Sequence, residues 1–211
     1  MVETNSPVKE AKESILVQRA LGKSWDYTGY RELVREQVDE GRTSGQNQSE
    51  AYVYYTLLNH NRMRRWEKRT KIPKKLQQDL SQYQESRIWL VLTETWCGDA
   101  APVLPLMDAF ASHSDSLELR IALRDEHPEL MDRFLTNKAR SIPKLLMIRP
   151  SDYRVMASWG PRPGDAARMV EEYRAEHGKL TEELRVSLQK WYNKDRGESL
   201  IRELSWLLAL E

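Results

Sequence analysis

The feature that most constrains the fold is a corner in the middle of the chain, where its only cysteine lies. Residues 88–92 read Ile-Trp-Leu-Val-Leu, a continuous apolar run that is typical of a buried strand. Residues 98–111 follow with a pattern that predicts a helix. Cys97 is therefore expected at a strand-to-helix corner, beside a helix N-terminus. Backbone N–H groups, the helix dipole and exposure at such a corner lower the pKa of a thiol.

A second short motif lies further along the chain. Arg140-Ser141-Ile142-Pro143 directly precedes residues 145–148, an apolar run that predicts another strand. Together with Trp-Cys-Gly at residues 96–98, this order of elements resembles the thioredoxin superfamily. More narrowly, Trp-Cys-Gly-Asp-Ala, Glu-Leu-Met-Asp at residues 129–132 and Arg-Ser-Ile-Pro-Lys are similar to a thioredoxin-like bacterial group.

The resemblance covers roughly residues 87–177 and implies an α/β, thioredoxin-like fold, with a central mixed sheet flanked by helices. It also implies a cis Ile142–Pro143 peptide bond that lies against the active cysteine. On this basis Cys97 is the expected catalytic residue. The residues expected to contact a substrate are those of the two motifs: Trp96, Gly98, Asp99, Arg140, Ile142 and Pro143.

Two positions depart from the redox-active family pattern. A dithiol thioredoxin has Cys-x-x-Cys, but Ala100 stands at the fourth position, so this chain cannot form an intramolecular disulfide. Val91 stands where the family carries a buried acid, six residues before the cysteine. Any redox cycle therefore needs an outside thiol, such as glutathione, a partner cysteine or a second copy of the chain.

The charged residues near the two motifs leave the reactivity of Cys97 open. The carboxylate of Asp99 raises the pKa of a neighbouring thiol, which opposes the helix N-terminus. Asp99 is equally favourable as a residue of the first helical turn, where a negative charge gains about 0.3–1 kcal/mol. Arg140 and Lys144 flank Ile-Pro and, by family analogy, face the region of Cys97. There they would lower the pKa of the thiol or bind an anion, although Arg140 fits equally well as a surface residue.

Two functions fit these residues. In the first, a monothiol oxidoreductase, Cys97 attacks a disulfide or accepts glutathione, and an outside thiol resolves the mixed disulfide. In the second, a non-catalytic binding module, the groove between Trp96 and Pro143 holds a partner segment. The retained motifs favour the first function, while the missing second cysteine and Val91 favour the second. On balance the sequence favours the thiol-dependent role, and whether the protein is an enzyme stays open.

The chain as a whole is expected to divide into three parts. Residues 1–85 form an N-terminal helical extension, residues 86–178 the thioredoxin-like domain and residues 179–211 a C-terminal helical extension. Apolar spacing and turn residues predict the following elements: helices at 26–40, from Ser49 and from Pro73, a loop at 41–48, a strand at 117–123, a helix at 128–136, a hairpin of 145–148 with 153–159, and helices from Asp165, through 180–191 and over 199–210.

The composition of the chain limits the classes of partner that are expected. The net charge of +1 gives no bulk preference for nucleic acid or anionic membranes, and no stretch approaches the roughly 20 apolar residues of a membrane span. Residues 1–7 have neither a basic nor an apolar leader region, so a cytoplasmic location is expected. A protein or a small thiol is the expected partner, and a monomer and a homodimer fit equally well.

Two further groups of residues are candidates for a binding site: a basic segment and the histidines. Residues 62–75 hold many basic side chains beside the single acid Glu67. This segment could be a binding face for phosphate or nucleic acid, with Trp66 as a stacking residue. A solvated helix surface is the favoured interpretation. The arginines of this segment would also suit an anionic ligand near Cys97, such as glutathione. The four histidines are scattered without zinc-like spacing, so neither a metal nor a resident cofactor is expected.

Overall fold

In the computed structural model, which describes residues 7–179 and 181–209, four strands form one sheet in the order β2-β1-β3-β4. The central strand β1 (Arg87–Thr93) runs parallel to β2 (Leu117–Leu123) and antiparallel to β3 (Lys144–Arg149). The edge strand β4 (Arg154–Trp159) pairs antiparallel with β3. This mixed sheet confirms the predicted α/β, thioredoxin-like fold class.

The place of each strand in the sheet explains its pattern of apolar and polar residues. β1 and β3 are buried at nearly every residue, because helices cover both faces of the middle of the sheet, and such strands read as continuous apolar runs. β4 alternates between exposed and half-buried residues, as expected of an edge strand with one solvated face. Val91, at the place of the family's buried acid, pairs with Ile121 and Leu145 in this apolar interior.

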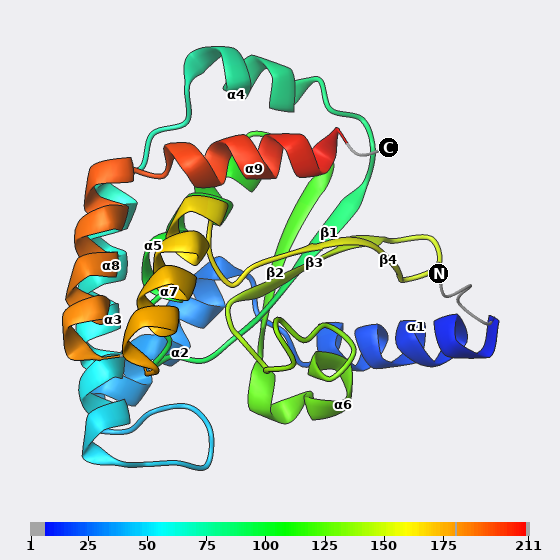
Figure 1. Cartoon of the computed structure of the whole chain (residues 1–211). Helices are drawn as coiled ribbons and strands as arrows, with labels where there is room; N and C mark the ends of the chain where they lie inside the picture. The colour runs from blue at the N-terminus through cyan, green and yellow to red at the C-terminus, as the bar shows by residue number, and fades with distance from the viewer. Residues whose placement is uncertain (1–6, 180, 210–211) are drawn as a thin grey trace.

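Helices surround the sheet (Figure 1). Their bounds are α1 (Pro7–Leu21), α2 (Tyr27–Asp39), α3 (Glu50–Arg69), α4 (Lys74–Ser81), α5 (Ala100–Ala111), α6 (Pro128–Met131), α7 (Gly164–His177), α8 (Glu182–Asp195) and α9 (Glu198–Leu208), with a 3-10 turn η1 (Arg124–Glu126). α3, α5, α7 and α8 gather on one side of the sheet, and α1 with α6 covers the other. Both helical extensions predicted from the sequence are therefore present.

The helical extensions bury their apolar faces against the thioredoxin-like part. Val17 of α1, Tyr30 of α2, Met63 of α3 and Leu204 of α9 belong to the same buried cluster as Trp89 of β1. α5 is buried along nearly its whole length, because it lies between the sheet and α3. The apolar faces of these helices are therefore covered within this chain.

Several predicted bounds differ from the structure. The helix after Cys97 begins at Ala100 rather than at residue 98. The helix predicted at 128–136 ends at Met131. The chain then leaves the helix and turns at Asn137 and Lys138, which both have positive φ. α1 was not separately predicted. The last helix ends at Leu208, and residue 210 of its predicted range lies outside the described residues.

In the part of the chain that the structure describes, two peptide bonds before proline are cis: Ile142–Pro143 and Gly160–Pro161. Among the described residues, no helix combines the length and the apolar character needed to cross a bilayer.

Candidate functional site

The two motifs meet at Cys97. Its backbone N–H donates to the carbonyl oxygen of Glu94 at 3.0 Å, which forms the tight turn between β1 and α5. Its thiol donates to the carbonyl oxygen of Ile142 at 3.3 Å. The strand-to-helix corner and the Ile-Pro segment, far apart in the sequence, therefore lie against each other.

The thiol of Cys97 is buried, with only 6% of the residue exposed. Burial raises its pKa to about 12, and the nearby carboxylate of Asp99 adds to the rise. The backbone N–H groups of Ala100 and Asp99 and the charge of Arg162 act in the opposite direction but do not prevail. The expected exposure of Cys97 at the corner is therefore wrong. Of the opposing effects on its pKa that the sequence left open, burial and the carboxylate of Asp99 outweigh the helix N-terminus, which favours the protonated thiol at neutral pH.

Asp99 is held in a buried ion pair. Its Oδ2 lies 2.6 Å from Nη2 of Arg162, and its Oδ1 accepts a hydrogen bond of 3.1 Å from the hydroxyl of Tyr192. Asp99 occupies the N-cap position of α5, but its side chain makes no capping hydrogen bond. The carboxylate thus joins the start of α5 to α8 and to the segment before α7, rather than capping its own helix.

Trp96 is fixed from two sides of the chain. The ring of Tyr52, from α3, stacks on it with 4.6 Å between centroids and 19° between planes. The guanidinium of Arg124, from η1, lies 5.1 Å from the centre of the same ring, within the range of a cation–π contact. The N-terminal extension therefore contributes directly to the site, through a residue that the sequence did not indicate.

A pocket of about 290 Å³ lies beside the corner. It contains five of the predicted site residues, Trp96, Cys97, Gly98, Asp99 and Ile142, and its other walls come from α3, α7 and α8. As the structure describes it, the lining includes neither Arg140 nor Pro143, which is buried.

Arg62 of α3 also lines the pocket. It belongs to the basic segment 62–75, whose arginines the sequence suggested for an anionic ligand near Cys97. Its Nη1 donates to Oδ1 of Asn59 at 3.2 Å, and a Cβ atom placed on Gly98 would lie 3.7 Å from it. Burial lowers the pKa of Arg62, and the charge of Arg65 lowers it further. Among the described residues, no carboxylate lies within ion-pair distance of Arg62.

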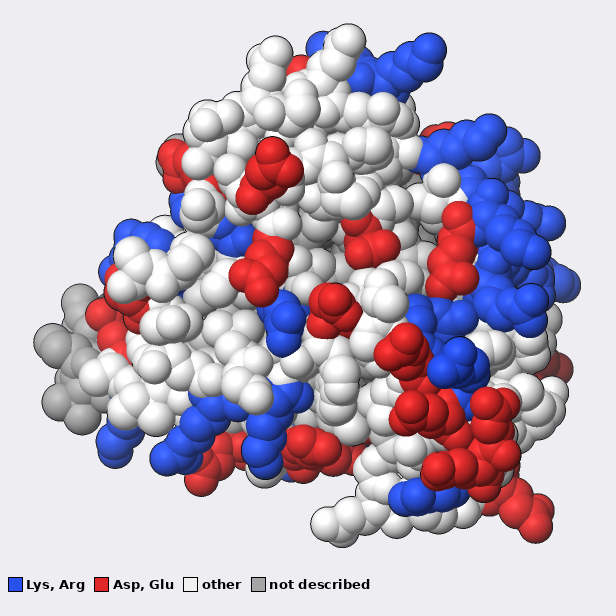
Figure 2. Space-filling model, turned by 180° about the vertical axis from the view of Figure 1, so that it is seen from behind, with Lys and Arg blue, Asp and Glu red and all other residues white. Residues whose placement is uncertain are grey.

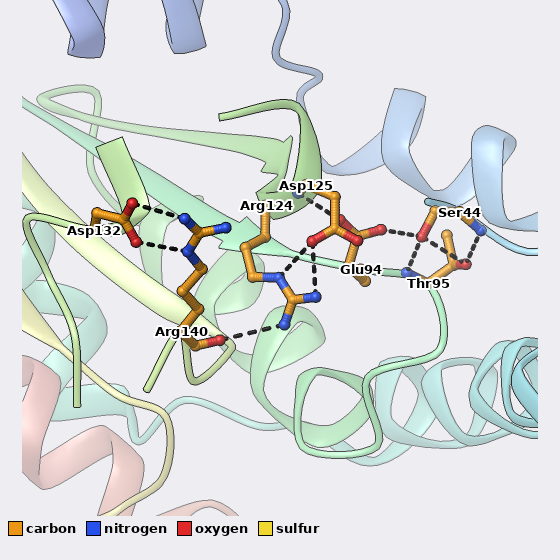
Figure 3. Close-up of polar contacts among 7 residues, drawn as sticks. All are labelled: Ser44, Glu94, Thr95, Arg124, Asp125, Asp132 and Arg140. Carbon is orange, nitrogen blue, oxygen red and sulfur yellow. Dashed lines mark hydrogen bonds and ion pairs between the residues drawn. The ribbon is translucent and has the colours of Figure 1, made fainter. Parts of the chain in front are cut away.

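Arg140 takes the surface position that the sequence left open, and Lys144 is buried away from the pocket beside Cys97. Arg140 forms two hydrogen bonds, of 2.6 and 2.7 Å, to the carboxylate of Asp132 in an exposed pair (Figure 3). Lys144 is buried and donates to Oγ1 of Thr136 at 2.6 Å. Their contacts thus serve the Ile-Pro loop and its neighbours, and neither residue lines the described pocket.

Below the corner, a polar network surrounds Glu94, which is fully buried (Figure 3). Its carboxylate accepts a short hydrogen bond from Oγ of Ser44 and one of 2.9 Å from the N–H of Asp125. Ser44 and Thr95 exchange further hydrogen bonds of 2.9 and 3.0 Å. Burial raises the pKa of Glu94. This network fastens the loop before α3 to the end of β1, and so helps to place α3 over the pocket.

The described residues contain no group of three or more histidine, cysteine, aspartate or glutamate side chains arranged to hold a metal ion.

Sequence similarity identifies the family of this chain. The sequence profile of the family described as Thioredoxin matches residues 45–174, more than half of the chain. The chain belongs to the thioredoxin family. The match begins before α3, so the family's unit extends into the segment that the sequence analysis assigned to the N-terminal extension. No curated protein matches this thioredoxin-family chain.

Two solved structures are similar to this thioredoxin-family protein. A protein of unknown function from Pseudomonas aeruginosa has a TM-score of 0.54 at 16% identity, over 75% of this chain and 86% of its own. An HIV epitope scaffold has a TM-score of 0.47 at 16% identity, over 79% of this chain and 94% of its own. The first likeness shows a shared fold alone, and the second is too weak to support a conclusion.

Proposed function

We propose that this thioredoxin-family protein is a non-catalytic binding module. Its pocket beside Cys97 takes a small ligand that combines an apolar or aromatic part with a carboxylate. The observation that carries the proposal is Arg62, a half-buried cation in the pocket with no carboxylate within ion-pair distance among the described residues. Glu182, which acts on Arg62 electrostatically, is already paired with Arg185. A cation removed from water in this way gains most from an ionised partner.

The other arginines of the pocket support the same chemistry. Arg185 pairs with Glu182 at 3.0 Å and Arg162 pairs with Asp99, so their charges are already balanced within the protein. Arg62 therefore remains the arginine of this pocket whose charge no carboxylate within ion-pair distance balances, among the described residues.

Size and lining limit the ligand. Apolar side chains from three elements, Ile142, Val170, Leu184 and Leu188, contribute to the walls. The volume of about 290 Å³ lies at the lower end of the range for small-molecule sites. We therefore favour a small molecule, or the terminal residue of a peptide, over the long partner segment that the sequence suggested.

Calorimetric titration with phenylacetate, and with phenylacetamide as its neutral counterpart, tests this proposal. Phenylacetate is expected to bind more tightly, and Arg62→Gln is expected to weaken its binding about tenfold or more, because a hydrogen bond to a charged group is lost. Arg64→Gln is the matched control, since Arg64 lies on the same helix, is exposed and is not a lining residue. No binding of phenylacetate, or equal weakening by both substitutions, contradicts the proposal.

Monothiol exchange is the second candidate, and one feature favours it. The N–H groups of Asp99 and Ala100 and the charge of Arg162 all lower the pKa of the Cys97 thiol, and the thiol lies at the pocket. In this chemistry the Cys97 thiolate attacks the glutathionyl sulfur of a mixed disulfide between glutathione and a partner, and releases the partner thiolate. The thiolate of a second, reduced glutathione then attacks the glutathionyl sulfur on Cys97, which restores the Cys97 thiolate and releases oxidised glutathione. Intact-protein mass spectrometry after treatment with oxidised glutathione, with Cys97→Ser as control, distinguishes the candidates. The binding proposal predicts no adduct on the folded protein.

A further inference from the structure

A second cavity, of about 670 Å³, lies away from Cys97, where the C-terminal part of α3 meets the turn between α8 and α9. Its described lining contains five cations and one acid, Glu198: the cations are Arg65, Lys68, Arg69, Lys71 and Arg196. Figure 2 shows Lys and Arg side chains gathered along one edge of the molecule, on the side where α3 lies. Two separate parts of the chain thus direct positive charge to one hollow.

The charge of this cavity is not balanced by the protein. Among the described residues, none of the five cations lies within 4.0 Å of a carboxylate, whereas Arg31, Arg140 and Arg149 elsewhere all have acidic partners. The chain as a whole carries a net charge of only +1, so the cluster does not follow from overall composition. Like charges held close together repel, and an anion bound among them would relieve that cost.

Helix structure accounts for part of the cluster only. Lys68 and Arg69 lie in the last turn of α3, where positive side chains complement the helix dipole. Arg65 lies a turn earlier, Lys71 follows the helix, and Arg196 ends α8 in a left-handed conformation. Arg196, as the C-cap of α8, complements the dipole of that helix. Arg65 and Lys71 are the cations of this cavity that lie outside the last turn of a helix, so their convergence on it needs another reason.

The side chains that line the cavity indicate which class of ligand it can bind. A binding face for single-stranded nucleic acid needs exposed aromatic rings on which bases stack. Trp66, the aromatic residue of this lining, is only 8% exposed and belongs to the core, so the stacking role considered from the sequence does not fit. Several arginine and lysine side chains around a hollow instead suit a compact anion with many charged oxygens.

We infer that this cavity binds a compact, multiply charged phosphate anion, such as a polyphosphate or the phosphate chain of a small metabolite. The site is independent of the pocket beside Cys97 and of its carboxylate ligand. It gives the protein a second binding activity on the opposite part of α3.

Calorimetric titration of the full chain with inorganic tripolyphosphate tests the inference. We expect binding that weakens as salt is added, and that weakens about tenfold or more in Lys68→Gln/Arg69→Gln. Arg196→Asn is a second test from the other wall, because asparagine tolerates the left-handed conformation of this position. All of these side chains are exposed, so the variants are expected to fold, and thermal unfolding checks this.

The control is Arg64→Gln/Lys190→Gln, which removes the same charge from exposed residues outside the lining. It should change the affinity for tripolyphosphate by less than about threefold, since neither side chain lines the cavity and water and salt weaken the interaction between exposed charges. Arg62→Gln should also leave this affinity intact, which separates failure here from failure of the carboxylate proposal. The absence of binding, equal weakening in the control, or tighter binding of single-stranded oligouridine than of tripolyphosphate would overturn the inference.

Discussion

Gly160→Ala is expected to lower the free energy of unfolding by about 3 kcal/mol or more, which is among the largest effects of any single substitution in this chain. Gly160 has a φ of +116°, a conformation that side chains other than glycine rarely adopt. A Cβ atom at this position would overlap the carbonyl oxygen of Pro143, and a backbone atom cannot rotate away as a side chain can. The cost therefore combines backbone strain with steric overlap, directly behind the Ile-Pro segment of the site.

Urea unfolding of Gly160→Ala and Gly178→Ala measures this effect against a matched control. Gly178 also has a positive φ, of +73°, but a Cβ atom there would meet nothing within 4 Å. Only the conformational penalty of about 1–2 kcal/mol is expected at that position. If the two substitutions cost the same, the close approach of Gly160 to Pro143 is not as described.

Arg162→Met is expected to lower the free energy of unfolding by about 3–5 kcal/mol. Methionine keeps much of the aliphatic stem of arginine but leaves the carboxylate of Asp99 buried, with the Tyr192 hydroxyl as its remaining side-chain partner. An uncompensated buried charge is the main cost of such a change. The loss should also loosen α8 over the pocket, because Asp99 joins α5 to that helix.

Two companion variants show whether the buried charge causes the loss. Arg149→Met removes the same side chain from an exposed pair with Asp152 and is expected to cost only about 0–1 kcal/mol. Adding Asp99→Asn to Arg162→Met removes the stranded charge and should recover part of the lost stability. A loss in Arg162→Met no larger than that in Arg149→Met would contradict a structural role for the pair.

The sequence predicted the elements that carry strong periodic signals. The apolar runs at 88–92 and 145–148 fall within β1 and β3, because a strand buried on both faces needs apolar residues at every position. The family resemblance placed Ile142 beside Cys97, where the thiol now has its hydrogen bond. These features depend on local sequence or on a motif that is read directly.

The walls of the pocket could not be predicted in this way. The contacts of Asp99 with Arg162 and Tyr192 join residues far apart in the chain, and no spacing rule connects them. The burial of Cys97 has the same origin, because it depends on how α3 and α8 pack over the corner. Periodicity shows that these helices have apolar faces but not which surface each face covers.

The rate of alkylation of Cys97 by iodoacetamide, measured from neutral to alkaline pH on the folded protein, tests the central claim most directly. The same titration in denaturant gives the reference, with a midpoint near the ordinary thiol pKa of about 8.5. With the thiol pKa raised to about 12 by burial, the rate should still be rising at the highest pH at which the protein stays folded. A plateau with a midpoint at or below the denatured reference would contradict the protonated thiol and would favour monothiol exchange over the binding module.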